Sequence, residues 1–250
     1  MILTLPNRAV RVFPAPVSSA PVAYVIGGFE GAEETASAWL SPRASLAFID
    51  CPQWNRDLSP WPAPACFRGG EAFLGGADRF LHELTEEIIP AVESSLAQPR
   101  AVDGGEKRVG EAFASVKGAQ KREKTAENVP PASRSIVGVS LAGLFGVYAL
   151  YRTDAFSVCA SVSGSLWFDG FLDFLKSEPL RARPEKIYLS LGDREEFTRN
   201  QRLAAVGEAT RAASAHFASR GIETALEMNP GNHFADHTLR LIRALDWLYR

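Results

Sequence analysis

The chain has 250 residues, of which 46% are hydrophobic and 22% charged, and its 27 Lys and Arg against 29 Asp and Glu leave a formal net charge of −2. This balance gives no electrostatic footprint for nucleic acid or an anionic membrane surface, and the apolar fraction excludes global disorder. Three cysteines without a CxxC pair cannot build a disulfide framework or a Cys-rich zinc site.

Short apolar runs alternate along the chain with longer stretches of helical periodicity. In chain order, the pattern predicts strands at residues 21–26, 45–49, 135–139, 155–162, 186–191 and 223–228. It predicts helices at residues 80–95, 144–151, 200–220 and 238–249. This alternation favours an α/β fold, with a mostly parallel central sheet covered by helices on both faces.

One segment differs from the rest in composition. Residues 97–131 hold seven Lys or Arg against five Asp or Glu and few large apolar side chains. Such a composition is typical of a solvated insertion between two core elements. The alternative, a basic segment that docks an acidic partner, has only a small net positive charge in its favour. We therefore expect a single domain of residues 1–250 with a charged insertion at about 97–131.

No targeting or membrane segment is evident from the sequence. The N-terminal residues lack a basic region followed by an apolar run of signal-peptide length. The uncharged stretch at residues 135–151 is broken by glycines, so a strand, a turn and a buried helix explain it better than a membrane span. We therefore expect a cytoplasmic protein with no membrane association; the oligomeric state is not specified by the sequence.

Ser140 stands where the strand at 135–139 turns into the next helix. Gly138, Ser140 and Ala142 follow the G-x-S-x-G pattern of a nucleophile elbow, with Ala142 in place of the second glycine. The positions two before and two after the serine must be small, because the strand and the helix nearly touch there. The N–H of Leu141, at the start of the helix, is placed to stabilise an oxyanion.

A serine nucleophile needs a base, and the chain has four histidines. His82 and His216 fall inside predicted helices, where no site chemistry surrounds them. His233 lies in a turn-rich loop between the last strand and the last helix, where an α/β-hydrolase carries its base. His237 is interpreted as a helix-start residue, and no HExxH zinc motif is present. The sequence therefore predicts no metal and no organic cofactor.

The acid that orients this base is expected in the loop after the strand at 186–191. Three carboxylates compete there; Glu195 is the first choice, and Asp193 and Glu196 stay open. A second oxyanion donor is expected from the loop after the strand at 21–26, where Gly28 or Phe29 would offer a backbone N–H.

Four segments together resemble a known family. They are GVSLAGLFGVYAL, SVSGSLWFDGFLDFL, YLSLGDREEFTRN and GNHFADHTLRLIRALDWL. These are similar to the putative-esterase branch of the α/β-hydrolases, which includes siderophore (enterobactin-type trilactone) esterases and esterase D-like enzymes. The resemblance implies Ser140 as nucleophile, His233 as base and Glu195 as acid, although some members use a Ser-His dyad.

The sequence departs from the family pattern at Ala142, at Gly164, where proline often precedes SLW, and at Gly27, where aspartate is common. None of these removes a reacting group, but the last two could reshape the pocket.

The resemblance favours a serine carboxylic-ester hydrolase that works through an acyl-enzyme on a small-molecule ester. A catecholate siderophore would require cationic and aromatic groups near the nucleophile. Arg56 and Trp167 are the first candidates for substrate binding, and Trp54 and Trp61 are further ones. Two alternatives stay open: a hydrolase-like protein that binds a ligand without turnover, and an acyltransferase on the same fold.

Overall fold

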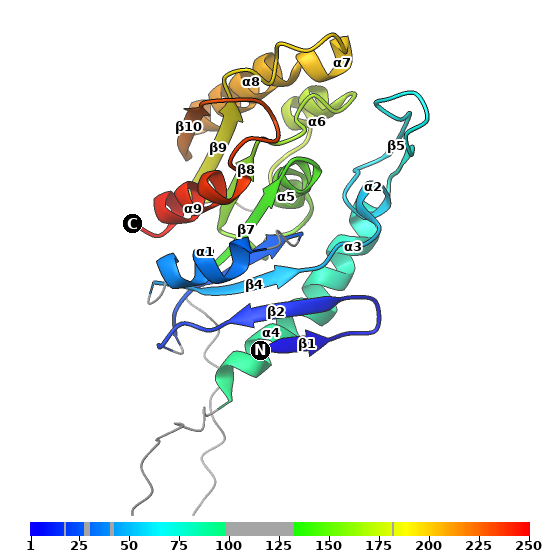
Figure 1. The fold of residues 1–250 in the computed structure, drawn as a ribbon. Helices are drawn as coiled ribbons and strands as arrows, with labels where there is room; N and C mark the ends of the chain where they lie inside the picture. The colour runs from blue at the N-terminus through cyan, green and yellow to red at the C-terminus, as the bar shows by residue number, and fades with distance from the viewer. Residues whose placement is uncertain (18, 28–30, 41–42, 99–132, 182) are drawn as a thin grey trace, which may run out of the picture.

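The computed structural model describes residues 1–17, 19–27, 31–40, 43–98, 133–181 and 183–250 (Figure 1). Its centre is an eight-stranded sheet in the order β1-β2-β4-β3-β7-β8-β9-β10. At one edge, β1 (Ile2–Thr4) and β2 (Ala9–Phe13) form an antiparallel hairpin, and β2 also pairs antiparallel with β4. All other neighbours in this sheet are parallel, and the predicted α/β fold is confirmed.

The parallel strands are β3 (Val22–Ile26), β4 (Ser45–Ile49), β7 (Arg134–Val139), β8 (Val158–Val162), β9 (Lys186–Gly192) and β10 (Glu223–Asn229). Every residue of β3, β4 and β8 is buried, as expected for strands that are covered on both faces. The predicted strand at 155–162 begins only at Val158. The preceding residues form a turn, in which the Ala155 N–H donates to the Thr153 hydroxyl.

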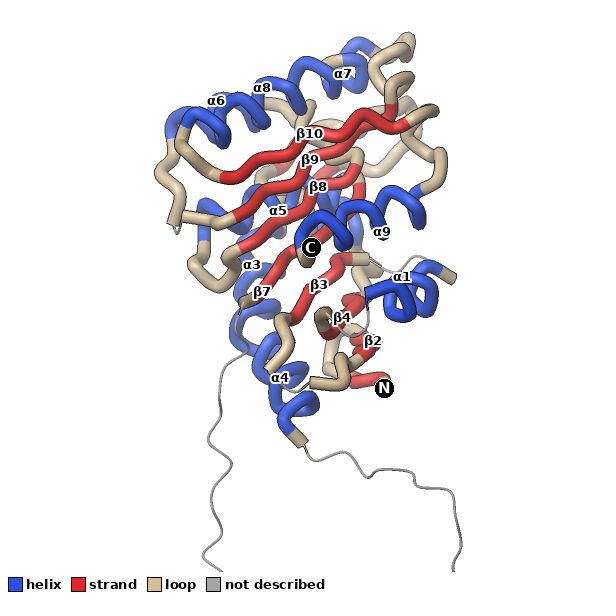
Figure 2. Tube along the Cα trace, turned by 90° about the vertical axis from the view of Figure 1, so that its left-hand side faces the viewer, coloured by secondary structure: helices blue, strands red, loops and turns tan. Residues whose placement is uncertain are grey.

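Helices form a layer on each face of the sheet (Figure 2). On one face lie α1 (Ala32–Leu40) and α9 (His237–Leu248). On the other lie α3 (Ala77–Glu83), α4 (Ile89–Ala97), α5 (Leu141–Arg152), α6 (Phe171–Ser177) and α8 (Val206–Ser219). Alternate residues of β3 pack into the two layers: Tyr24 and Ile26 into the larger core, Ala23 and Val25 into the smaller one.

Several helices differ in extent from the prediction. The helix expected at 80–95 is part of a longer one, in which a π-helical turn at Leu84–Ile88 joins α3 to α4. The helix expected at 144–151 begins earlier, directly after Ser140. The helix expected at 200–220 divides into α7 (Gln201–Ala204) and α8. The elements that were not predicted are β1, β2, α1, α6, α2 (Trp54–Asp57), β5 (Pro62–Ala63) and β6 (Phe73–Leu74).

The charged insertion predicted at 97–131 falls almost entirely on residues 99–132, which lie outside the described residues. At its start, α4 ends at Ala97. No helix in the described parts of the chain is both long and apolar enough to cross a membrane.

The parallel arrangement decides where functional side chains meet. β7, β8, β9 and β10 are consecutive neighbours in the sheet and point the same way. Their carboxyl ends therefore share one edge, and the loops that follow them lie side by side there, which is where ligands bind in open α/β sheets.

Candidate active site

Ser140 occupies a sharp turn between β7 and α5. Its backbone has φ 59° and ψ −123°, in the positive-φ region that residues with a side chain rarely adopt. The turn brings strand and helix so close that a Cβ on Gly138 would overlap the backbone carbonyl of Ala142. Ala142 itself is fully buried, so its methyl group fits where the pattern usually has glycine.

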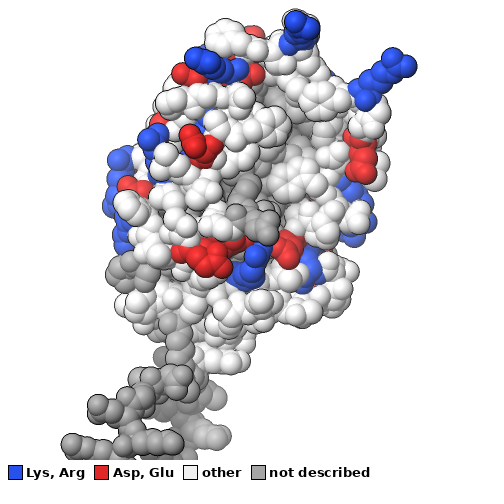
Figure 3. All heavy atoms as spheres, in the orientation of Figure 1, with Lys and Arg blue, Asp and Glu red and all other residues white. Residues whose placement is uncertain are grey.

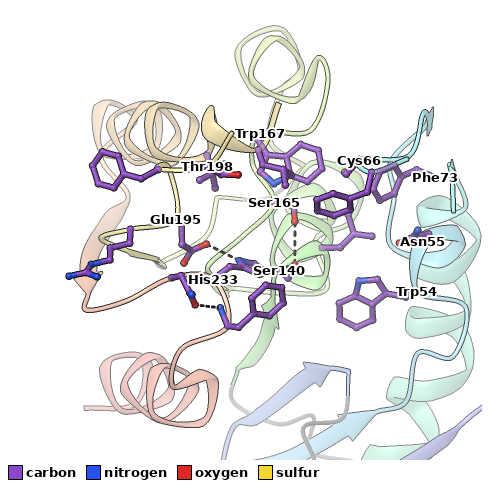
Figure 4. A pocket seen from close by; sticks show the side chains of 18 residues that line it. Trp54, Asn55, Cys66, Phe73, Ser140, Ser165, Trp167, Glu195, Thr198 and His233 are labelled. Carbon is purple, nitrogen blue, oxygen red and sulfur yellow. Dashed lines mark hydrogen bonds and ion pairs between the residues drawn. The ribbon is translucent and has the colours of Figure 1, made fainter. Parts of the chain in front are cut away.

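His233 and Glu195 lie next to this serine. His233 follows β10 and Glu195 follows β9. The Nε2 atom of His233 is 3.0 Å from Ser140 Oγ, and its Nδ1 atom is 2.8 Å from Glu195 Oε2 (Figure 4). Because an ionised carboxylate can only accept, Nδ1–H donates to Glu195 and Nε2 is left to accept the Ser140 hydroxyl proton. The structure thus brings the three predicted residues together.

Glu195 is buried, and its carboxylate is well bonded. Its Oε1 atom accepts hydrogen bonds from Ser163 Oγ at 2.7 Å, the Gly192 N–H at 2.7 Å and Arg240 Nη1 at 3.1 Å. Burial acts to raise the pKa of Glu195, but the hydrogen bonds from His233, Ser163 and the Gly192 N–H outweigh it, so the pKa lies below its ordinary value. Glu195 is therefore held as a carboxylate.

The two competing carboxylates make other contacts. Asp193 Oδ1 accepts a hydrogen bond of 2.8 Å from the Gly231 N–H, and Glu196 forms an ion pair of 2.7 Å with Arg211. His237, the first residue of α9, donates from Nε2 to the backbone carbonyl of His233. Of the three loop carboxylates, Glu195 is the one that contacts His233.

A cavity of about 500 Å³ opens beside Ser140. Figure 4 shows Trp54, Phe73 and Trp167 on the side of Ser140 away from His233 and Glu195. Three exposed phenylalanines also line it, namely Phe67, Phe197 and Phe234. On the face shown in Figure 3, acidic and basic side chains are intermixed and surround a hollow between uncharged residues. The walls suit an apolar or aromatic group next to the reacting carbonyl.

Ser165 is a neighbour of Ser140 that the sequence prediction missed. Its Oγ is 3.4 Å from Ser140 Oγ, and its N–H donates to the Ser140 carbonyl at 3.0 Å. Gly164, one of the departures from the family pattern, precedes it. A Cβ on Gly164 would overlap Ser161 Oγ, so glycine fits this tight corner.

Two residues predicted near the substrate do not line the cavity. Arg56 instead forms an ion pair of 2.9 Å with Asp57, whose carboxylate is fully buried. Trp61 donates from Nε1 to the Asp169 carbonyl and packs among aromatic rings of the larger core. The prediction that Arg56 lies in the substrate pocket is therefore wrong. The guanidinium of Arg56 instead pairs with the buried carboxylate of Asp57. Trp167 and Trp54 do line the cavity.

The predicted oxyanion donors are described only in part. Leu141 is the first residue of α5, where N–H groups have no partner within the helix and point at the end of the axis. Gly28 and Phe29 lie outside the described residues. Gly27, just before them, has φ 92°, and a Cβ there would lie 3.0 Å from the ring of Trp54. Glycine is thus required at this departure from the family pattern.

Among the described residues, no group of three or more His, Cys, Asp or Glu is arranged to hold a metal ion. Besides Arg194, Glu195 and His233, the polar side chains that line the cavity include the hydroxyls and amides of Ser165, Asn55 and Thr198.

Comparisons with known proteins agree with this geometry. Among curated sequences, the chain is 21% identical over 212 residues to the uncharacterized protein YbbA of Bacillus subtilis (strain 168), covering 82% of this chain and 73% of that protein. Among solved structures, it resembles an IroE-like serine hydrolase from Shewanella oneidensis, with a TM-score of 0.72 and 17% identity over 97% of this chain and 75% of that one. It also resembles siderophore hydrolase EstA from Aspergillus nidulans, with a TM-score of 0.66 and 19% identity over 100% and 93% of the two chains.

These structural likenesses show a shared fold. The sequence match that assigns the family is a separate one: the family described as "Putative esterase" matches residues 119–248, just over half of the chain. The matched range contains Ser140, Glu195 and His233. The chain therefore belongs to this esterase family of α/β-hydrolase-fold proteins and is an ester hydrolase.

Proposed function

We propose that this esterase cleaves carboxylic esters through an acyl-enzyme on Ser140. The observation that carries the proposal is the continuous chain of contacts from Ser140 Oγ through His233 to Glu195, at 3.0 and 2.8 Å. Ser140 Oγ attacks the ester carbonyl carbon while His233 Nε2 takes its proton. The bond to the leaving alcohol then breaks, and His233 returns the proton to that alcohol. A water molecule attacks the acyl-enzyme in the same way and releases the acid.

Glu195 keeps the imidazole in the tautomer with Nε2 free and stabilises its protonated form. The tetrahedral intermediate carries a negative charge on the former carbonyl oxygen. We assign the Leu141 N–H to this oxygen, with the second donor from Phe29 or Gly28 as the sequence predicts. The role of Leu141 is supported by its position as the first residue of α5.

For the substrate, we place siderophore esters of the trilactone type first. Support comes from the similarity to the Aspergillus nidulans protein EstA, a siderophore hydrolase, and from the aromatic walls of the cavity, where Trp167 and Trp54 would pack against aryl groups. Among described lining residues, the charged ones are Arg194 and Glu195, so aromatic packing rather than a cluster of cations is the basis for recognition. The cytoplasmic location and single-domain organisation stay predictions.

The proposal is tested with a fluorophosphonate and with short-chain p-nitrophenyl esters. Wild-type protein should be labelled and should hydrolyse the esters, whereas Ser140→Ala and His233→Ala should each lose both activities. His216→Ala serves as the matched histidine control, because His216 contacts Tyr151 in the core and not the cavity. A wild-type protein that neither labels nor turns over any ester would favour a ligand-binding role. Product analysis with an added alcohol separates hydrolysis from acyl transfer.

A further inference from the structure

One charged side chain near the site is almost fully buried. Arg240 lies on α9, and the whole residue is 1% exposed. Leu241, the next residue, and Ala244, one turn further along the helix, belong to the apolar core. A guanidinium in such a place has lost its hydration and is stable only when its charge and its N–H groups are matched. The partners of Arg240 therefore indicate why it is there.

Those partners belong to two different parts of the site. The Nη1 atom donates to Glu195 Oε1 at 3.1 Å and to Ser163 Oγ at 2.9 Å. The Nη2 atom donates to the backbone carbonyls of Pro230 at 2.9 Å and Asn232 at 3.1 Å. The planar guanidinium thus binds the acid through Nη1. Through Nη2 it binds the loop that carries His233. A rigid fork of this kind fixes distances that a lysine could not fix.

We propose that Arg240 is a positioning residue, which sets the distance between Glu195 and His233. The inference rests on the proposed function, since it acts through the assigned base and acid. Arg240 is not itself among the residues that line the cavity, and it reaches the loop of His233 only through backbone carbonyls.

Glu195 is contacted from several elements. From the loop after β10 it faces His233, and from α9 it faces Arg240 and His237. Its remaining contacts, Ser163 and the Gly192 N–H, are neutral. Arg240 therefore links the carboxylate of the acid directly to the backbone of the loop that carries the base.

The test compares Arg240→Gln and Arg240→Lys with Arg243→Gln. Arg243 lies three residues further along the same helix but pairs with Glu227 at the surface, which makes it a matched control. Values of kcat and KM for a p-nitrophenyl ester are measured for the wild type and for each variant. Thermal melting shows whether each variant is folded.

For Arg240→Gln we expect kcat to fall by more than about tenfold, yet by less than the roughly 10⁴-fold loss that follows removal of the orienting acid. KM should stay within about threefold because Arg240 does not itself line the cavity. Arg240→Lys keeps the charge and loses the planar fork, so its kcat should fall as well. Arg243→Gln should match the wild type.

A KM that rises as much as kcat falls, or a kcat loss that follows a loss of folded protein, would show that Arg240 has only a structural role. If Arg240→Gln does not fold, Arg240→Lys decides: a wild-type kcat in that variant overturns the positioning role. Failure of the proposed function is distinguishable from either result, because it would appear as undiminished ester hydrolysis by Ser140→Ala and His233→Ala.

Discussion

At the scale of single residues, Glu195 and Asp193 offer a direct comparison of two carboxylates in one loop. Glu195→Gln replaces an acceptor of His233 by an amide that can hold the ring in the wrong tautomer, so we expect kcat to fall by roughly 10²- to 10⁴-fold. Asp193 accepts only the Gly231 N–H among the described contacts, and an asparagine oxygen can accept it as well. Asp193→Asn should stay within a few fold of the wild type. Equal losses in ester hydrolysis would mean that the acid is assigned wrongly.

Glu195 also predicts how stability depends on pH. Its pKa in the folded protein lies below the ordinary 4.5, because hydrogen bonds to the carboxylate outweigh the effect of burial. Such a group stabilises the folded state fully above its unfolded pKa, and this contribution is lost as pH falls through the folded value.

Urea unfolding at about pH 6, 5, 4 and 3 checks this expectation. Over the range below about pH 5, the free energy of unfolding of the wild type should fall more steeply than that of Glu195→Gln, which has no proton to gain at this position. Parallel curves for the two proteins would contradict the depressed pKa.

At the scale of elements, the turn between β7 and α5 sets the geometry of the nucleophile. Gly138→Ala would drive a methyl group into the carbonyl of Ala142. We expect this variant to lose about 1–3 kcal/mol of stability, as overpacked sites do, and to lose most of its fluorophosphonate labelling, because the turn must open and Ser140 must move.

Gly146→Ala, in the middle of α5, is the matched control. Its added Cβ would lie 3.5 Å from Cys159 Sγ, an ordinary contact. Replacing a glycine inside a helix should then stabilise the protein by about 0.5–1 kcal/mol, with labelling unchanged. Thermal melts and labelling rates of the two variants are compared. Equal behaviour of the two glycine variants would argue against a steric requirement at the turn.

The central elements were predictable because their signals are local. Continuous apolar runs such as 45–49 show buried parallel strands directly, and the G-x-S-x-A spacing shows the turn at Ser140. The hairpin β1–β2 was not predicted. Arg11 lies between the buried Val10 and Val12 of β2, and it pairs with buried Glu33 from α1 at 2.7 Å and with Asp50 at 3.4 Å. Partners that are distant in sequence leave no local pattern.

The candidate site was predictable to a similar degree. Ser140, His233 and Glu195 each follow a recognisable strand, so chain order located them, although it left Asp193 and Glu196 open beside Glu195. Arg56 was predicted at the pocket because a catecholate substrate would require a cation near Ser140; the burial of its partner Asp57 is not evident from the local sequence. The sequence also holds a pattern that could have identified Arg240 as buried, because this residue lies on the apolar face of α9 with Ala244 and Leu248. A charge at a core position indicates a buried acid elsewhere.

At the scale of the whole molecule, a buried ion network joins the N-terminal edge of the sheet to the pocket wall. Arg8, between β1 and β2, contacts Asp57 of α2 at 3.4 Å and Glu83 of α3 at 2.7 Å. Its guanidinium also lies 4.2 Å from the centre of the Phe80 ring. Helix α2 also carries Trp54, which lines the cavity. The edge hairpin thus supports the segment that shapes the site, although it lies at the far edge of the sheet from β9 and β10 (Figure 1).

We therefore expect Arg8→Met to lose about 3 kcal/mol in free energy of unfolding, because it leaves Glu83 and Asp57 buried with an incomplete set of partners. Loosening of α2 should also raise KM more than it lowers kcat, since Trp54 forms a wall of the cavity but does not touch the proposed reacting atoms. Urea unfolding and p-nitrophenyl ester kinetics measure the two effects separately.

Arg43→Met is the control with the same change of charge and shape. Arg43 pairs with Asp246 at 2.9 Å, but both side chains are partly exposed, at 34% and 45%. A pair that water still reaches contributes at most about 1 kcal/mol, and it lies away from α2, so KM should not move. If Arg8→Met proved no more costly than Arg43→Met, the edge hairpin would be an independent attachment to the sheet, and the support of the pocket wall would have to come from the sheet's own packing against α3 and α5.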